Sequence, residues 1–94
     1  MSGSLHSIKY RQFLQSLRLA REKSGVSQTE LAARMKVTQA FVSKSERGER
    51  RLDLLEVFAW LKALDYSPTT YLDREYRKWE QGRPEKALKK TSKE

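Results

Sequence analysis

The stretch SQTELAARMKVTQAFVSKSERGERR, residues 27–51, contains two short helical patterns in close succession and decides the fold. Each pattern begins with a hydroxyl residue that can accept a hydrogen bond from a free backbone N–H. Ser27 opens the first pattern, and Glu30 follows three residues later at the spacing of a capping box. Thr38 opens the second pattern and Gly48 ends it. Two short helices joined this tightly predict a helix-turn-helix, with the second helix as its recognition helix.

The second of these helices, expected from Gln39 to Arg47, differs from a helix that only fills a core. Its apolar side is narrow, with Phe41 or Val42 turned inward and Ser45 as a further inward candidate. The remaining positions are polar or small: Gln39, Ala40, Ser43, Lys44 and Arg47. This helix therefore presents hydrogen-bonding groups to its surroundings.

Composition restricts the chemistry open to the chain, whose 94 residues are the size of one domain. It contains no cysteine, which excludes disulfides, thiolate metal sites and thiol catalysis. Twenty basic against twelve acidic residues give a net charge of +8. This charge suggests a polyanionic partner, either nucleic acid or an anionic membrane surface, with ordinary solubility charge as the alternative. No apolar run approaches the roughly 20 residues of a membrane span and no signal pattern is present, so a cytoplasmic protein is expected.

Three further helices are predicted around this pair. Apolar residues at spacings of three and four indicate a helix over residues 8–23, ended by Gly25. Asp53 and Glu56 form another capping box at the start of a strongly amphipathic helix. Pro68 stands at the first position of a last helix that runs to about residue 81.

The predicted organisation is a single all-α domain of five helices. It covers residues 8–81, with the helix-turn-helix at residues 28–47 and its first helix at residues 28–35. Residues 1–7 are expected to be a flexible N-terminus. Residues 82–94 are charged and poor in apolar side chains, which predicts a basic, disordered tail.

With these residues in place, the chain from about Phe13 to Leu72 resembles the Cro-type phage repressor family, also called the xenobiotic-response-element (XRE) family. The family pattern is carried by Leu17-Arg18 and Arg21, Val26-Ser27-Gln28, Glu30-Leu31-Ala32, Val37-Thr38, Val42-Ser43 and Glu46-Arg47-Gly48. The resemblance implies a five-helix, lambda-repressor-like DNA-binding domain. Two positions depart from the pattern: Lys36 stands where the family commonly has glycine, and Ser45 where it usually has an apolar residue.

The resemblance also implies roles for individual residues. Gln28 would contact a DNA phosphate at a helix N-terminus, where free N–H groups and the helix dipole favour an anion. The start of the recognition helix would read base edges in the major groove, through Thr38, Gln39, Ala40, Ser43 and Lys44. Among these, Gln39 can bind adenine, Lys44 can bind guanine, and Ala40 can contact a thymine methyl group.

Five charged residues near the recognition helix have two interpretations each. The resemblance pairs Arg21 with Glu46 and places this ion pair close to the DNA backbone. We favour a mainly structural role for the pair, because leaving one charge of a partly buried ion pair without its partner costs stability. Arg47, Arg50 and Arg51 are predicted to contact phosphates. A solvated charged loop is the alternative for these three arginines.

Aromatic residues concentrate in the C-terminal third, where core packing of the last two helices accounts for Phe58. Trp60, Tyr76 and Trp79 exceed what the exterior of a small domain usually shows. They predict a homodimer through the last two helices. Two-fold symmetry would place the recognition helices about 34 Å apart, facing successive major grooves of a pseudo-palindromic operator.

Nothing in the sequence assembles an enzyme site, since His6 is the only histidine and the four glycines are scattered. No metal, cofactor or small-molecule ligand is indicated. The leading hypothesis is a sequence-specific regulator of transcription that binds double-stranded DNA, most simply a repressor. The alternatives are an antitoxin or restriction–modification controller of the same fold, or a protein-interaction adaptor that has lost DNA reading. A membrane-surface binder is the weakest option, because the basic residues do not form one long amphipathic face.

Overall fold

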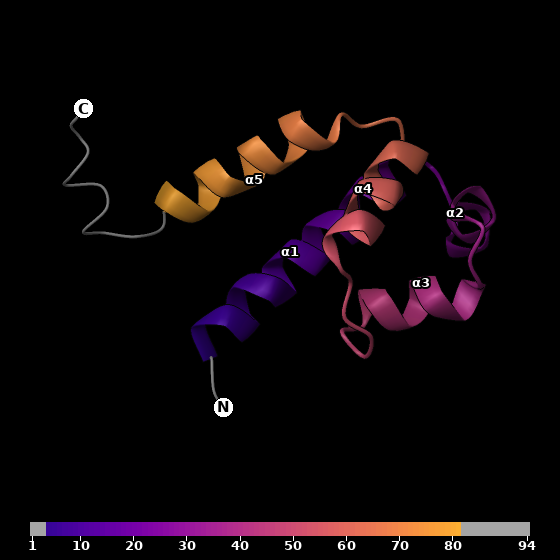
Figure 1. The fold of residues 1–94 in the computed structure, drawn as a ribbon, viewed down its shortest axis with the longest axis horizontal. Coiled ribbons are helices and arrows are strands. Elements are labelled where there is room, and N and C mark those ends of the chain that lie inside the picture. The colour runs from indigo at the N-terminus through magenta and orange to yellow at the C-terminus, as the bar shows by residue number, and fades with distance from the viewer. Residues whose placement is uncertain (1–3, 82–94) are drawn as a thin grey trace.

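Five α-helices make up the computed structural model, which describes residues 4–81 (Figure 1). Their bounds are α1 Ser4–Lys23, α2 Gln28–Met35, α3 Gln39–Glu46, α4 Leu54–Ala63 and α5 Pro68–Gln81. No strand occurs within the described residues, and the predicted all-α fold is confirmed. The predicted basic tail at residues 82–94 lies outside them. Over the part of the chain that is described, no helix is both long and apolar enough to cross a membrane.

The helix boundaries follow the predictions closely, with one clear exception. α2 has the predicted bounds, and α3 ends at Glu46, one residue before its predicted end. α1 begins at Ser4, four residues before the start predicted for this helix. An apolar spacing reports only the part of a helix that packs on a core, and a first turn can extend beyond that part.

Capping side chains fix the beginnings of the short helices. The Ser27 hydroxyl accepts a hydrogen bond from the N–H of Glu30 at 3.0 Å. The Glu30 carboxylate accepts from Arg34 at 3.1 Å instead of returning to the cap, so only half of the predicted capping box forms. At α4 the box is complete, because Asp53 and Glu56 each accept a hydrogen bond from the backbone N–H of the other.

Four of the helices end in the same backbone geometry. The residue after the last turn is left-handed in each case: Gly25 (φ 72°), Lys36 (φ 62°), Gly48 (φ 78°) and Asp65 (φ 66°). After α2, the N–H of Val37 donates to the carbonyl of Ala32 at 2.9 Å, and the N–H of Lys36 donates to that of Ala33 at 3.2 Å. These two bonds form a Schellman motif, which satisfies carbonyls that a helix end leaves without partners. The turn between α2 and α3 therefore keeps its left-handed residue although that residue is lysine.

Replacing Lys36 with glycine is expected to raise the free energy of unfolding by about 1 kcal/mol, because a side chain strains the left-handed conformation. Lys36 is exposed, so the change leaves no cavity. Urea unfolding followed by circular dichroism measures the difference. Asp65→Gly is the matched control, with a smaller expected gain because aspartate tolerates this conformation better. A loss of stability in Lys36→Gly would contradict strain at this turn.

A single core includes residues from all five helices and their connectors. Its buried apolar members are Leu14, Leu17, Ala20, Val26, Leu31, Ala32, Val42, Leu52, Val57, Trp60, Leu61, Leu64 and Tyr71. Trp60 has none of its surface exposed, so the prediction that it contributes to a dimer surface is wrong. α4 packs against both α2 and α5. A helix between two neighbours buries residues that lie off its main apolar stripe, which explains the error.

The arrangement separates the two ends of the molecule. Figure 1 shows α2 and α3 together at one end and the C-terminal part of α5 at the other, with α1 extending between them. The hydroxyl groups of Ser16 and the buried Tyr71 are hydrogen-bonded, which ties the first turn of α5 to the middle of α1. A site formed by α3 is therefore far from one formed by the end of α5.

Candidate nucleic-acid interface

α3 packs against α1 and α2 through one side and faces solvent with the other. Thr38 caps it by accepting a hydrogen bond from the N–H of Phe41 at 3.0 Å. Val42 and Ser45 have no exposed surface and define the inward side. The opposite side consists of the exposed residues Thr38, Gln39, Ala40, Lys44 and Arg47, with Ser43 partly buried beside them. The residues expected to read bases thus lie on α3 or cap it, and nearly all of them are exposed.

A buried ion pair ties α1 to the end of α3. Arg21 Nε donates to Glu46 Oε2 at 2.6 Å, and Arg21 Nη2 donates to Oε1 at 3.0 Å. Arg21 Nη1 also donates to the carbonyl of Val26 at 2.9 Å. The two side chains are only 9% and 2% exposed, so solvent and salt screen the pair weakly. So little of the pair is accessible that its main effect is to join the two helices.

Gln28 extends this network to the exposed start of α3. Its side-chain nitrogen donates to Glu46 Oε1 at 2.8 Å, and its side-chain oxygen accepts from Gln39 Nε2 at 2.7 Å. An ionised carboxylate can only accept hydrogen bonds, so Glu46 determines that the nitrogen of Gln28 faces it. The oxygen of Gln28 is then left to face Gln39. The first residue of α3 is therefore oriented by a buried charge on that helix's last turn.

Arg47, one of the predicted phosphate contacts, is engaged by an acidic neighbour in the free protein. Its Nε and Nη2 each lie 3.0 Å from a carboxylate oxygen of Glu49, and Nη1 donates to the Ser43 hydroxyl. The hydrogen bond, and secondarily the coulombic attraction, raises the pKa of Arg47 and lowers the pKa of Glu49. Both side chains are more than half exposed, and such surface pairs contribute little to stability. A phosphate can therefore replace Glu49 at low cost.

Arg50 joins α3 to α4 and has a packing role that the sequence did not reveal. Its guanidinium donates twice to Glu56, at 3.0 and 2.9 Å, and its central carbon lies 4.1 Å from the centroid of the Phe41 ring. Two hydrogen bonds lower the pKa of Glu56. The bond from Arg50 has the larger effect, and the bond from the backbone N–H of Asp53 has the smaller one. Glu56 thus caps α4 and holds Arg50 over α3 at the same time.

Lys44 on α3 and Arg51 in the connector that follows it form no ion pair with a carboxylate within residues 4–81. The Arg51 guanidinium lies 4.4 Å from the centroid of the Tyr10 ring. The Tyr10 hydroxyl accepts a hydrogen bond from the N–H of Leu52 at 3.0 Å, so Tyr10 positions this connector. Lys44 and Arg51 can bind phosphate without losing an ion pair.

Ser45 is fully buried at the base of the site. Its hydroxyl is fully buried and has no hydrogen-bond partner among the described residues. A buried hydroxyl without a partner costs about 1–3 kcal/mol. The departure from the family pattern at this position therefore weakens the packing of α3 without changing which side of it faces outward.

The first turns of the helices differ in charge. α2 and α4 carry Glu30 and Glu56 there, where a carboxylate stabilises the positive end of the helix dipole. α3 carries no acidic residue in its first turn. Its N-terminus is thus left without a local anion, which suits a polyanionic partner. Within residues 4–81, no group of histidine, aspartate or glutamate side chains could hold a metal ion.

Two capped short helices, the second with an exposed polar face and no acid at its start, define a helix-turn-helix DNA-binding protein. Residues 17–71 match the family described as Helix-turn-helix. The structure is similar to that of an "XRE-family like protein from Pseudomonas syringae pv. tomato str. DC3000", with a TM-score of 0.76 and 36% sequence identity over 79% of this chain and 90% of that one. The chain belongs to the XRE family of helix-turn-helix regulators, which are DNA-binding proteins rather than enzymes. A comparison with curated proteins gave no match.

Proposed function

We propose that this protein is a transcriptional repressor that recognises a specific double-stranded DNA operator by inserting α3 into the major groove. The observation that carries this proposal is the hydrogen-bonded chain from Arg21 through Glu46 and Gln28 to Gln39. A side chain that is already held in place loses less conformational entropy when it binds, and it discriminates better between base edges. Bound at an operator, such a domain excludes polymerase from the promoter.

The exposed face of α3 supports particular contacts. Gln39 is suited to the N6 and N7 positions of adenine, Lys44 to the O6 and N7 positions of guanine, and Ala40 to a thymine methyl group. Thr38 and Ser43 add short hydroxyl groups that can bind bases or phosphates. The phosphate contacts are Gln28, Arg47 and Arg51, whereas Arg50 acts by holding α3 against α4.

Alanine at Gln39 or at Lys44 is expected to weaken operator binding by about 1–3 kcal/mol and to relax the preference at one base pair. Binding to genomic duplex fragments, measured over a range of salt concentrations, identifies the operator and gives the salt slope. Lys62→Ala, which removes an exposed lysine from α4, is the matched control and should leave the base preference unchanged. Weak, sequence-blind binding that neither α3 variant alters would instead indicate an interaction adaptor.

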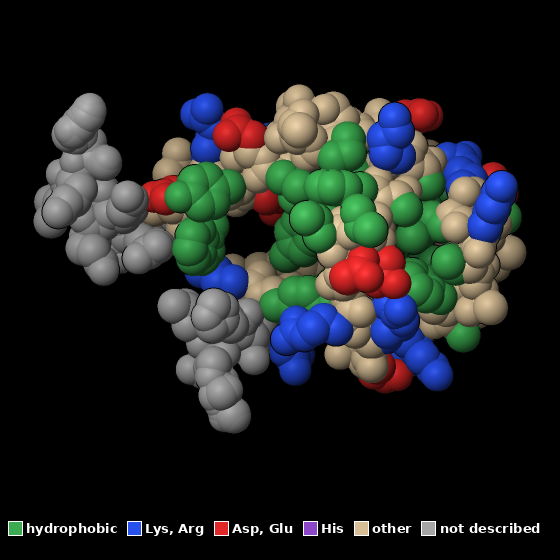
Figure 2. Space-filling model, in the orientation of Figure 1, with side chains coloured by type: hydrophobic (Ala, Val, Ile, Leu, Met, Phe, Trp, Pro, Cys, Tyr) green, Lys and Arg blue, Asp and Glu red, His purple; other side chains and the backbone are tan. Residues whose placement is uncertain are grey.

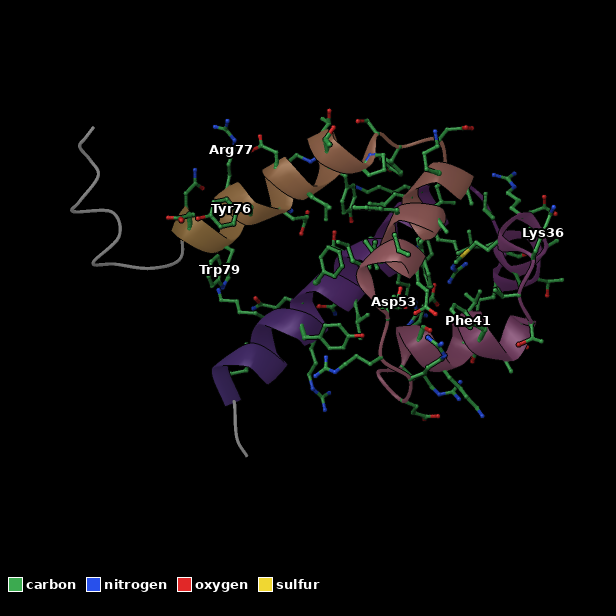
Figure 3. All side chains as sticks on the ribbon, in the orientation of Figure 1. Lys36, Phe41, Asp53, Tyr76, Arg77 and Trp79 are labelled. Atoms are coloured by element: carbon green, nitrogen blue, oxygen red, sulfur yellow. The ribbon has the colours of Figure 1, made fainter. Side chains whose placement is uncertain are left out.

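We also propose that the protein acts as a homodimer formed at the beginning of α4. Leu54 and Leu55 are 61% and 73% exposed there, and Arg50 joins this turn to α3. The surface first predicted from Tyr76 and Trp79 lies at the opposite end of the molecule from α3 (Figure 3). A two-fold axis at that far end would separate the recognition helices widely. An axis beside the two leucines keeps them close, as a spacing of about 34 Å requires.

Sedimentation at tens of micromolar is expected to show a dimer that Leu55→Ser converts to a monomer, because the substitution removes exposed apolar area from the contact. Tyr76→Ser is the matched control on α5 and should leave the dimer intact. A dimer that survives Leu55→Ser but dissociates in Tyr76→Ser would instead locate the dimer surface at Tyr76 and Trp79. A monomeric wild-type chain would rule out both surfaces.

A further inference from the structure

A groove of about 520 Å³ lies between α1 and α5, far from α3. Phe13 and Leu19 of α1 and Leu72, Tyr76 and Trp79 of α5 supply its apolar lining. Figure 3 shows Trp79 directed from α5 toward α1, and Figure 2 shows a hollow bordered by hydrophobic side chains in this region. Pockets that bind small molecules usually enclose about 300–1,000 Å³ and are mostly apolar with a few polar groups. This groove has the size and the lining of such a site.

The groove is separate from the DNA-binding module. Residues 17–71 match the helix-turn-helix family, and of the residues that line the groove only Leu19 falls among them. The remaining lining comes from residues 9–16 of α1 and residues 72–79 of α5. The hydrogen bond between Ser16 and Tyr71 holds these two helices together at one end of the groove. None of the residues that line the groove belongs to α3, so the apolar surface of the groove is not needed to pack α3.

The charges around the groove favour an anion. Lys9 and Lys78 line it together with a single carboxylate, that of Glu75. Glu75 is paired with Lys78 at 3.0 Å and is thereby neutralised. Lys9 has no carboxylate partner within residues 4–81, and its ammonium group lies 5.9 Å from the centroid of the Trp79 ring. An unpaired cation therefore stands beside an aromatic wall.

We propose that this groove binds an amphipathic organic carboxylate. The apolar body of the ligand, an aliphatic chain or an aromatic ring system, lies against Leu19, Tyr76 and Trp79. Its carboxylate pairs with the ammonium group of Lys9. A second copy of this chain fits less well, because two-fold symmetry would bring the same uncompensated lysine to both sides of the contact. The site is independent of the proposed operator contacts and adds a ligand to the protein's functions.

Sodium decanoate and decanamide, which share a chain length and differ in charge, test the proposal when titrated into the full chain. Trp79 reports binding by its fluorescence, while Trp60 is buried in the core and gives a constant background. Saturable binding of one decanoate per chain is expected, at least fivefold tighter than that of decanamide. Lys9→Gln should weaken decanoate binding about fivefold, the usual contribution of a partly exposed ion pair, and leave decanamide binding unchanged.

Two further variants control for position and for folding. Lys23→Gln removes an exposed lysine from the other end of α1 and should leave both affinities within twofold. Leu19→Glu places a carboxylate on the half-exposed wall and should abolish decanoate binding while operator affinity is retained, which shows that the domain is folded. Equal affinities for decanoate and decanamide, or an unchanged affinity in Lys9→Gln, would overturn the carboxylate site. A dimer that Leu19→Glu dissociates and that decanoate does not affect would make a second copy the occupant instead.

Discussion

Replacing Arg21 with methionine should lower the free energy of unfolding by about 3–5 kcal/mol, because it leaves the carboxylate of Glu46 buried without its cation. Glu46 is 2% exposed and would keep only the hydrogen bond from Gln28. The carbonyl of Val26 would lose its side-chain donor as well. A small domain has only about 5–15 kcal/mol of total stability, so this loss is a large part of it.

Urea unfolding followed by circular dichroism measures the change. Arg18→Met, one turn earlier in α1, removes the same side chain from the exposed pair with Glu22 and should cost less than about 0.5 kcal/mol. The double variant Arg21→Met and Glu46→Leu should recover part of the lost stability, because it removes both charges and leaves no unpaired carboxylate in the interior. A loss below about 1 kcal/mol in Arg21→Met would contradict the burial on which this prediction rests.

The stability of this domain and its proposed base contacts both depend on the ion pair between Arg21 and Glu46. Without Arg21, Glu46 loses the two hydrogen bonds that fix its carboxylate, and the acceptor that orients Gln28 is then no longer held in one position. Gln39 in turn loses a defined partner. Arg21→Met is therefore expected to reduce operator affinity although Arg21 is itself almost inaccessible. This outcome distinguishes a positioning role from a direct phosphate contact.

The sequence predicted the helices well because their ends depend on local chemistry. Ser27, Thr38 and Asp53 each bond a backbone N–H three residues later, and such caps are recognisable from residue type and spacing. Gly25 and Gly48 end helices because they adopt positive φ without strain. Lys36 adopts the same conformation against its preference. The spacing of the two helices placed a turn at this position, but only the family resemblance, which commonly has glycine here, pointed to a left-handed residue.

The partners of the charged side chains could not be predicted in the same way. The sequence allows Glu30 to return to its cap or to pair with Arg34, and these two bonds differ little in free energy. Arg50 stacks on Phe41 and pairs with Glu56 only because the connector folds back between α3 and α4. Such choices are made by tertiary packing, which no local pattern contains.

Ala40→Glu is expected to weaken operator binding by at least about 100-fold, because a carboxylate in the major groove faces the negative charge of DNA and like charges at an interface cost several kcal/mol. Ala40 is exposed at the second position of α3, so the substitution disturbs no packing. A glutamate in the first turn of a helix stabilises it by about 0.3–1 kcal/mol. The variant should therefore be at least as stable as the wild-type chain while its affinity for DNA is lost.

Thr69→Glu is the matched control, because it adds the same charge at the second position of α5, where Thr69 is also exposed. It should change operator affinity by less than about threefold, the effect of one added charge away from the contact. Thermal unfolding and a fluorescence-based DNA titration on both variants give the two quantities needed. Equal losses of affinity in the two variants would mean that DNA responds only to the net charge of the protein. A loss of affinity confined to Ala40→Glu would place the DNA at the start of α3, which, unlike α2, carries no acidic residue in its first turn.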